Sequence, residues 1–334
     1  MAGGLTSALM ARPALRPMTE DDLGGAARLL AARHGRHRVC EPLLDPRFEH
    51  LDVAADQVDS LLRSDQASGA VAVVGDEVVG YLLGAPRPGA LWGPNLWVEP
   101  AGHALADDAD AELVRDLYAL AAERWAREGR TAHYVVAPSH DGRVLDAWWR
   151  LGFGQQHVHA IREVPVHATY PSTEGFTIRL AGPADIRALA GLDLVLDQHQ
   201  LRSPVFSGLP PPSLETAVAE WVEGVDDPDL TTFVAERDGA VLGSAIGCSV
   251  ARSGMHAGLC RPPEAALLGF AAVRPDAQGE GLGRGLGETV LAWAAGAGYR
   301  SVVTDWRATN LLSSRIWPRL GFRPTFLRLH RLIG

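Results

Sequence analysis

LLGFAAVRPDAQGEGLGRGLGETVLAWAA, residues 267–295, carries the clearest structural pattern in the chain. Its apolar run ends at Val273 and predicts a buried strand. A helix is predicted further on, because apolar residues recur there at helical spacing: Leu282, Leu286, Val290 and Trp293. Three glycines in the intervening loop leave backbone N–H groups open to an anion: Gly279, Gly281 and Gly283. The stretch therefore predicts a strand, a loop that binds phosphate or pyrophosphate, and a helix.

Spacing excludes two familiar phosphate loops. A dinucleotide fingerprint needs a glycine where this chain has Arg284 or Leu286. The phosphate loop of nucleoside triphosphatases needs a lysine, and this sequence contains none. The pattern that remains is Gln278-x-x-Gly281-x-Gly283 after a buried strand.

A second motif follows another apolar segment, residues 301–304. It consists of Asn310, a small residue at Ser313, an aromatic residue at Trp317, and the tripeptide LGF at 320–322. Together the two motifs resemble the GNAT acetyltransferase superfamily, whose members bind acetyl-coenzyme A (acetyl-CoA). The resemblance implies an α/β (α+β) fold in which a mixed, mostly antiparallel twisted sheet is flanked by helices.

The same resemblance implies a cofactor site. In the superfamily a bulge splays one strand from the next, and the pantetheine arm lies in the gap like an added strand. Here Ala271, Ala272 and Val273 are expected to face that arm. The pyrophosphate is expected on the loop residues Gln278, Gly279, Glu280, Gly281, Leu282, Gly283 and Arg284, and the second motif adds Asn310 and Ser313.

The general acid departs from the family pattern. Many relatives carry a tyrosine where this chain has Trp317, and an indole N–H cannot supply a proton near neutral pH. Ser313 and Ser314 are the nearest hydroxyl groups, while a water molecule or the leaving thiolate itself are alternatives.

The general base is also not supplied by the motif. The position that holds a glutamate in some relatives aligns with Leu267. The nearest carboxylates are Asp305, at the end of the next predicted strand, and Glu264, just before the first. Asp305 is our candidate, although either carboxylate is also compatible with a solvated strand end.

Composition narrows the possible partners. A chain of 334 residues suggests two domains. The net charge of −9 argues against nucleic acid and anionic membranes, and favours a small-molecule amine as substrate. Three cysteines at unrelated spacings fit neither a disulfide framework nor a zinc site, and residues 1–14 lack the pattern of a signal peptide, so a cytoplasmic location is expected. The oligomeric state is left open.

The chain repeats itself. The segments 15–23 and 178–186 share a strand, a polar turn and an acidic helix start, and two hairpin patterns follow at 71–83 and 232–246. Asp141-x6-Trp148 then matches Asn310-x6-Trp317. We therefore expect tandem GNAT folds at residues 1–165 and 176–334, joined by a linker at 166–175.

The first copy differs from the second where the cofactor would bind. Aligning the preceding strands places His103 at the Gln278 position, and Asp108 at the Gly283 position. Aspartates at a helix start repel a second anion. We therefore interpret the first domain as degenerate, with a structural or substrate-shaping role, and keep coenzyme A binding by another geometry as the alternative.

Substrate contacts are expected from the segment 193–212 and the loop 252–263. Asp193 and Asp197 would share one helix face and could hold an ammonium group, unless that face is simply exposed. His157 and His159 share one face of a predicted strand, where they fit the strand surface better than a metal site, and no metal is expected.

The resulting hypothesis is an acetyl-CoA-dependent N-acetyltransferase of tandem GNAT architecture, acting on the amine of a small molecule through its second domain. One alternative is a non-catalytic acyl-CoA-binding or regulatory protein. Another is an aminoacyl or peptidyl transferase on a duplicated GNAT fold, which predicts a charged-tRNA partner.

Overall fold

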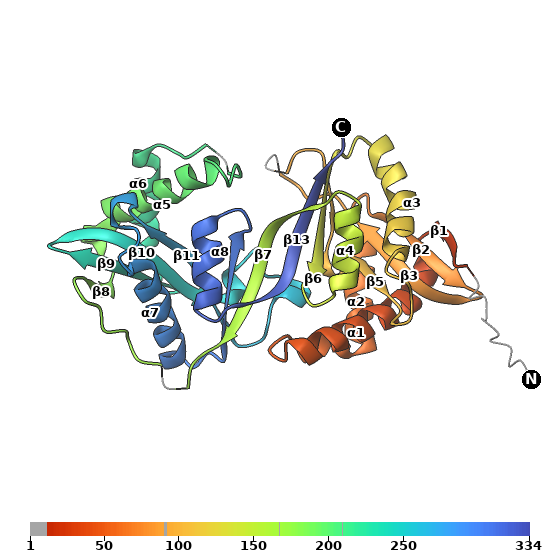
Figure 1. Cartoon of the computed structure of the whole chain (residues 1–334), viewed down its shortest axis with the longest axis horizontal. Coiled ribbons are helices and arrows are strands. Elements are labelled where there is room, and N and C mark those ends of the chain that lie inside the picture. Colours follow the sequence, from red (N-terminus) through yellow and green to blue (C-terminus); the bar gives the residue numbers. More distant parts are fainter. Residues whose placement is uncertain (1–11, 90–91, 167, 209) are drawn as a thin grey trace, which may run out of the picture. The chain divides into compact units, whose positions relative to one another are not determined.

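The computed structural model describes residues 12–89, 92–166, 168–208 and 210–334. The first eleven residues, on which much of the signal-peptide prediction rests, and the linker residue at 167 lie outside this part. The chain forms two compact units (Figure 1). Unit 1 comprises residues 1–40, 46–154 and 330–334, and unit 2 comprises residues 41–45 and 155–329.

Unit 1 combines an antiparallel sheet with a parallel strand pair. Its sheet has the order β1-β2-β3-β5, and β4 pairs with β6 in parallel. The strands are β1 (Ala14–Pro17), β2 (Ser68–Val74), β3 (Glu77–Gly84), β4 (Asn95–Val98), β5 (His103–Leu105) and β6 (Ala132–Pro138). The helices are α1 (Leu23–Cys40), α2 (Leu51–Leu62), α3 (Leu113–Arg127) and α4 (Gly142–Arg150).

Unit 2 is built on a longer mixed sheet with the order β13-β7-β12-β11-β10-β9-β8. Its strands are β7 (Gly154–Glu163), β8 (Thr177–Leu180), β9 (Leu230–Arg237), β10 (Ala240–Ser249), β11 (Ala265–Val273), β12 (Ser301–Arg307) and β13 (Arg323–Leu332). The helices are α5 (Ile186–Leu201), α6 (Leu214–Gly224), α7 (Leu282–Gly296) and α8 (Leu311–Arg319). The β11–β12 pair is parallel and joined through α7, whereas β8, β9 and β10 pair antiparallel, so the predicted mixed, mostly antiparallel sheet with flanking helices is confirmed.

The sequence repeat has a structural counterpart at the start of each half. In unit 1, Arg16 makes two hydrogen bonds to Asp22, of 2.8 and 2.6 Å. In unit 2, Arg179 makes the same pair to Asp185, at 2.7 and 2.9 Å. Each aspartate also accepts the backbone N–H three residues before it, which fixes the turn between the strand and the helix.

The compact units do not divide where the sequence repeat divides. Strand β7 belongs by sequence to the first half, yet it pairs antiparallel with β12, from Glu163↔Ser301 to His157↔Arg307. Residues 155–165 therefore pack in unit 2. The predicted ranges 1–165 and 176–334 describe the repeat rather than the compact units.

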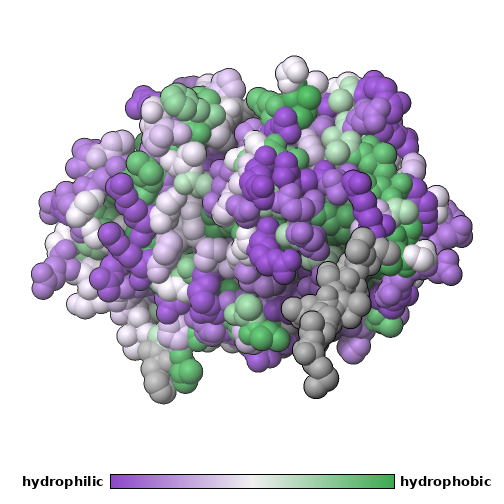
Figure 2. All heavy atoms as spheres, turned by 45° about the vertical axis from the view of Figure 1, so that its right-hand side comes forward, coloured by the Kyte–Doolittle hydropathy of each residue, from purple (hydrophilic) through white to green (hydrophobic). Residues whose placement is uncertain are grey.

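Hydrophilic residues dominate the face drawn in Figure 2, where hydrophobic ones form small scattered groups. Single exposed apolar side chains such as Trp149 are normal at a protein surface. Among the described helices, none has the length and apolar character needed to cross a bilayer.

Candidate active site

The glycine loop leads directly into the N-terminus of α7. Gly279 and Gly281 have φ angles of +90° and +88°, which side chains with a Cβ rarely adopt. Gly281 is the N-cap residue and has no side chain with which to cap the helix. The first helical N–H groups are therefore left to an external acceptor, and the fifteen-residue helix adds its positive dipole end. This cradle suits a phosphate or pyrophosphate group.

Two charged side chains of the loop have protein partners. Arg284 forms a 2.7 Å ion pair with Glu288 one turn along α7, and Glu280 pairs with Arg237. The Arg284 side chain remains 73% exposed, so it can swing toward an anion at modest cost because surface ion pairs are weak. Gln278 donates a 3.4 Å hydrogen bond to the Val273 carbonyl oxygen, which folds the loop back on β11.

Strand β11 carries the bulge that the family resemblance implies. Against β10, its register shifts at Ile246/Gly247, where Leu268 and Phe270 take adjacent partners and leave Gly269 unpaired. Its pairing with β12 ends at Leu268↔Thr304. The Thr304 hydroxyl closes this last rung with a 3.0 Å hydrogen bond to the Leu268 carbonyl oxygen. Beyond this pair of residues, β11 and β12 are no longer paired. We call the point where the two strands separate, at Leu268 and Thr304, the fork.

Residues of β11 beyond the fork are those predicted to face the pantetheine arm. Ala271 and Val273 are half-buried, whereas Ala272 is buried. Among the described strands, β10 is the pairing partner of all three, on one side of β11. The opposite edge of this half of the strand is left for another extended segment to pair with.

The second motif forms the start of α8. The Asn310 side chain accepts hydrogen bonds from the backbone N–H of Leu312 (3.1 Å) and Ser313 (3.3 Å), and its oxygen lies 3.1 Å from Nε2 of His199 on α5. Asn310 is thus a helix cap. Ser314 donates to the Ala308 carbonyl oxygen at 2.9 Å, which occupies one of the two predicted hydroxyls. The catalytic roles of Ser313 and Ser314 stay predictions.

Trp317 is buried and packs between α7 and the chain that follows α8. Its indole approaches the Phe322 ring edge to face, with ring centroids 6.1 Å apart. A Cβ added at Gly287 would come within 3.3 Å of the indole, so α7 needs a glycine there. The position that holds a tyrosine in many relatives is a packing position in this structure.

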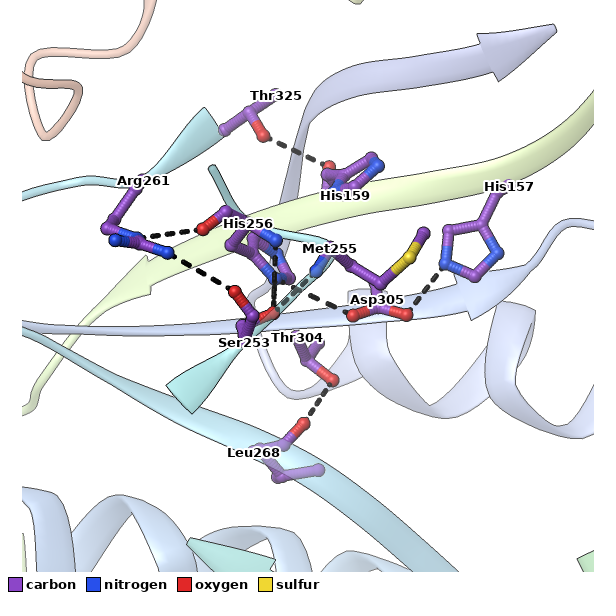
Figure 3. A network of polar contacts seen from close by, with 10 residues as sticks. All are labelled: His157, His159, Ser253, Met255, His256, Arg261, Leu268, Thr304, Asp305 and Thr325. Carbon is purple, nitrogen blue, oxygen red and sulfur yellow. Dashed lines mark hydrogen bonds and ion pairs between the residues drawn. The ribbon is translucent and has the colours of Figure 1, made fainter. Parts of the chain in front are cut away.

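A cluster of titratable side chains surrounds Asp305, immediately past the fork (Figure 3). Nε2 of His157, on β7, lies 2.7 Å from Oδ1 of Asp305. Nδ1 of His256 lies 3.7 Å from Oδ2, and the His159 ring meets the His256 ring at 5.0 Å between centroids. The three histidines are buried, whereas the Asp305 side chain is 24% exposed. Asp305 is therefore the member that a ligand can reach.

The loop that carries His256 is tied down by short-range contacts. The Ser253 hydroxyl oxygen accepts the backbone N–H of Met255 (3.2 Å) and of His256 (3.0 Å), and lies 3.1 Å from Nδ1 of His256. Arg261 donates to the carbonyl oxygens of His256 and Ser253. Part of the predicted substrate loop 252–263 therefore lies beside Asp305.

Burial and hydrogen bonding set the charges of this cluster. Burial would raise the pKa of Asp305, but the His157 hydrogen bond and the neighbouring imidazoles outweigh it and hold the pKa below its usual value. Burial lowers the pKa of His157 to about 4, against the opposing effect of Asp305. Burial also lowers the pKa values of His159 and His256. At neutral pH the cluster is thus one carboxylate among neutral imidazoles.

The structure changes the interpretation of the two histidines on β7. They share one strand face as predicted, but both are buried, so the expected position at the strand surface is wrong. Among the described residues, no group of three or more His, Cys, Asp or Glu side chains is arranged to hold a metal ion. The alternation of His157 and His159 was the available signal, and it gave no indication of Asp305 as partner.

Other predicted site residues lie elsewhere. Glu264 precedes β11 at the end opposite the fork and pairs with Arg300 at 3.6 Å, so it is not close to Asp305 along the sheet. Asp193 and Asp197 lie on α5 as predicted. Asp193 accepts a 2.5 Å hydrogen bond from the Trp221 indole. Burial raises the pKa of Asp193 to about 6 and also raises that of Asp197.

The counterpart region in unit 1 is built differently. His103 starts strand β5 instead of a loop, and α3 begins only at Leu113. The expectation that Asp108 lies at a helix start is therefore wrong, because residues 103–105 extend the sheet by pairing with β3. Asp107 instead pairs with Arg36 at 3.3 Å.

Unit 1 also contains a cavity of about 390 Å³ beside β5 and the start of α4. Its lining includes charged, imidazole and aromatic groups: Arg36, His103, Asp107, His140, Arg143 and Trp148. Whether the first half has lost its cofactor site stays a prediction.

The sequence of the second half matches a family model. The model described as acetyltransferase (GNAT) family covers residues 196–322, which span α7, α8, the glycine loop and the fork. This segment of unit 2 is therefore similar to the GNAT family. No curated protein sequence matches the chain at a significant level.

Solved structures show that the tandem GNAT fold extends over the whole chain. A GCN5-related N-acetyltransferase from Sphaerobacter thermophilus is 18% identical, with a TM-score of 0.58 over 97% of this chain and 96% of that one. A tandem GNAT protein from the clavulanic acid biosynthesis pathway is 17% identical, with a TM-score of 0.50 over 96% and 99%. At these identities the likeness concerns the fold alone.

Proposed function

We propose that this protein is an acetyl-CoA-dependent N-acetyltransferase that acts on the amine of a small molecule, with its active site in unit 2. The observation that carries the proposal is one arrangement: an uncapped, glycine-lined helix N-terminus beside a splayed strand, with an ionised carboxylate at the fork. The helix end suits a diphosphate, the free strand edge suits an extended amide chain, and the carboxylate suits an amine.

The residues of the chain have separate tasks in this proposal. Bound acetyl-CoA would supply the acetyl thioester that the amine attacks. The loop 278–284 would hold the pyrophosphate, and Ala271 to Val273 would align the pantetheine arm. Asp305 would take the proton that the amine loses when its nitrogen attacks. Asp193 and Asp197 on α5 would hold a second cationic group of the acceptor.

The direction of approach follows from the alternation of side chains on β12. Asp305 and Val303 are two residues apart and face the same side, where Val303 packs with Leu267 and Cys248. Helix α7 covers the other face, because Trp293 of α7 lies against Gly247 of β10, whose side-chain direction is opposite to that of Cys248. An amine that reaches Asp305 would therefore approach from the face opposite α7.

The test is thiol release from acetyl-CoA in the presence of a panel of primary amines, with product identified by mass spectrometry. We expect amine-dependent release of thiol and an N-acetyl product. Asp305→Asn should lower kcat by about 100-fold or more if the carboxylate is the base. Binding of acetyl-CoA without turnover across the panel would instead favour a non-catalytic acyl-CoA-binding protein. The buried Trp317 is compatible with that alternative, because it replaces the tyrosine that acts as an acid in many relatives.

A further inference from the structure

Asp305 receives its strongest contact from a strand that lies outside the second sequence repeat. His157 on β7 and Asp305 on β12 are 148 positions apart in sequence and are diagonal neighbours in the antiparallel β7–β12 pair, whose register sets His159 opposite Asp305 and His157 opposite Arg307. At 2.7 Å the bond is a short, charge-assisted hydrogen bond. The carboxylate cannot donate, so the imidazole carries its proton on Nε2 and donates it to Asp305.

We propose that His157 is a positioning residue for Asp305, and that strand β7, contributed by the first half, thereby completes the active site of the second. This proposal rests on the proposed function only where it calls the surroundings of Asp305 an active site. The contact itself would orient the carboxylate and keep it ionised whether or not an acceptor amine is known.

Three further observations support a positioning role. His157 is buried, so an acceptor meets the exposed side of Asp305 and not the imidazole. Within the described part of the chain, Nδ1 of His157 has no hydrogen-bond partner, so the ring is held through Asp305 rather than between two partners. Finally, the Thr325 hydroxyl of β13 donates to the His159 carbonyl oxygen of β7 at 3.2 Å. This bond holds the backbone of β7 two residues from His157.

The other titratable and charged groups around His157 agree with a neutral imidazole at this position. His159 on β7, His256 on the loop 252–263, Arg307 on β12 and Arg328 on β13 all act on it electrostatically or face the same cluster. The two guanidinium groups disfavour an imidazolium at this position. A neutral imidazole that donates one hydrogen bond is the state that remains.

The experiment compares three variants of the full-length protein by the titration of Asp305, followed through ¹³C-labelled aspartate side chains in NMR spectra. In the wild type the Asp305 carboxyl is expected to stay ionised at pH values below about 3.9, the ordinary pKa of an aspartate side chain. His157→Leu removes the donor, so burial should then move the titration above that value. His157→Gln keeps an N–H donor and should restore much of the wild-type titration. His159→Leu is the matched control, since this buried ring lies on the same face and makes no hydrogen bond to Asp305 among the described contacts.

The two results that would overturn the proposal do not depend on turnover. One is an Asp305 titration that is the same in the wild type and in His157→Leu. The other is a shift in His159→Leu as large as that in His157→Leu, which would reveal a general effect of the buried cluster. A ¹⁵N spectrum of the wild type provides a check without mutation: a His157 that carries its only proton on Nδ1 would contradict the donation to Asp305.

Where an acceptor amine is found, the kinetics give a further distinction. His157→Leu should lower kcat and move the acid limb of kcat/KM to higher pH, while acetyl-CoA affinity is unchanged and His157→Gln recovers much of the rate. If Asp305 titrates as predicted but no amine is acetylated, the proposed function fails and the positioning contact stands. If amines are acetylated and the acid limb does not respond to His157→Leu, the function stands and the positioning role fails.

Discussion

At the scale of single residues, the candidate site combines one family-like feature with one replacement. Gly281 has the left-handed backbone that the loop requires, so its identity follows from local geometry. Trp317 stands where many relatives have tyrosine, and it is buried against Phe322 and α7. The acid of the reaction must therefore be another group, and Trp317 is expected to act through packing.

Trp317→Phe tests this assignment. The smaller ring should leave a partial cavity and lower the free energy of unfolding by about 1–3 kcal/mol, with acetyl-CoA affinity and turnover retained. Urea unfolding and steady-state rates measure the two effects. Trp149→Phe, at a position that is 46% exposed, is the control and should change little. Complete loss of turnover with intact acetyl-CoA affinity would show that the indole N–H takes part in the reaction.

At the scale of elements, the helix that follows the binding loop starts differently from the helix of the second motif. Asp141 caps α4 by accepting the Val144 N–H at 3.1 Å, and Asn310 caps α8. Helix α7 begins at Gly281 without a side-chain cap. Helices α2, α3 and α5 also begin without a side-chain cap, so the open helix end alone does not mark the site. What marks it is the preceding loop, whose Gly279 and Gly281 have left-handed backbones and leave the helix end open to an anion.

The Arg179–Asp185 pair predicts a pH-dependent stability for the start of α5. Its hydrogen bonds with Arg179 lower the pKa of Asp185, so the folded state is stabilised above the ordinary pKa of about 3.9, and that stabilisation is lost as pH falls through the lower folded value. Asp185→Asn should therefore lower the free energy of unfolding at pH 7 by about 1–2 kcal/mol, discounted for the exposed Arg179, and by less at pH 3.

Urea titrations of the wild type and Asp185→Asn at both pH values give this measurement, with the exposed Asp226 changed to Asn as the control. An equal loss at pH 7 and pH 3 would mean that the charge of Asp185 is not what stabilises the turn.

At the scale of the whole molecule, sequence patterns predicted what depends on neighbours in sequence. The strand, loop and helix from β11 to α7, the two hairpins and the tandem fold all follow from local spacing, and the structure confirms them. The pairing of β7 with β12 could not be read from the sequence, because a strand pattern does not name its partner. For the same reason, the sequence did not indicate that His157 and Asp305 are in contact. The helix start predicted near Asp108 was wrong for another reason: the alignment of the two halves did not allow for strand β5.

The tandem arrangement places different chemistry in two related folds. Unit 2 presents open backbone amides at α7, whereas the corresponding region of unit 1 continues as β5 and brings Asp107 into an ion pair with Arg36. The central claim is therefore that acetyl-CoA binds the glycine loop of unit 2 through its pyrophosphate.

Calorimetric titration of acetyl-CoA into the wild type, Gly283→Asp and Gly283→Asn tests that claim most directly. Gly283 has an ordinary helical backbone, and a Cβ there would meet the end of the Ile316 side chain at 3.3 Å and Cγ2 of Val273 at 3.8 Å, so both variants should fold. A carboxylate about 5 Å from the pyrophosphate at an effective dielectric constant of about 20 should weaken binding by about 3 kcal/mol, roughly 100-fold, while the neutral Asn should bind much more nearly as the wild type does. Equal affinity of wild type and Gly283→Asp would contradict the account and place the cofactor elsewhere.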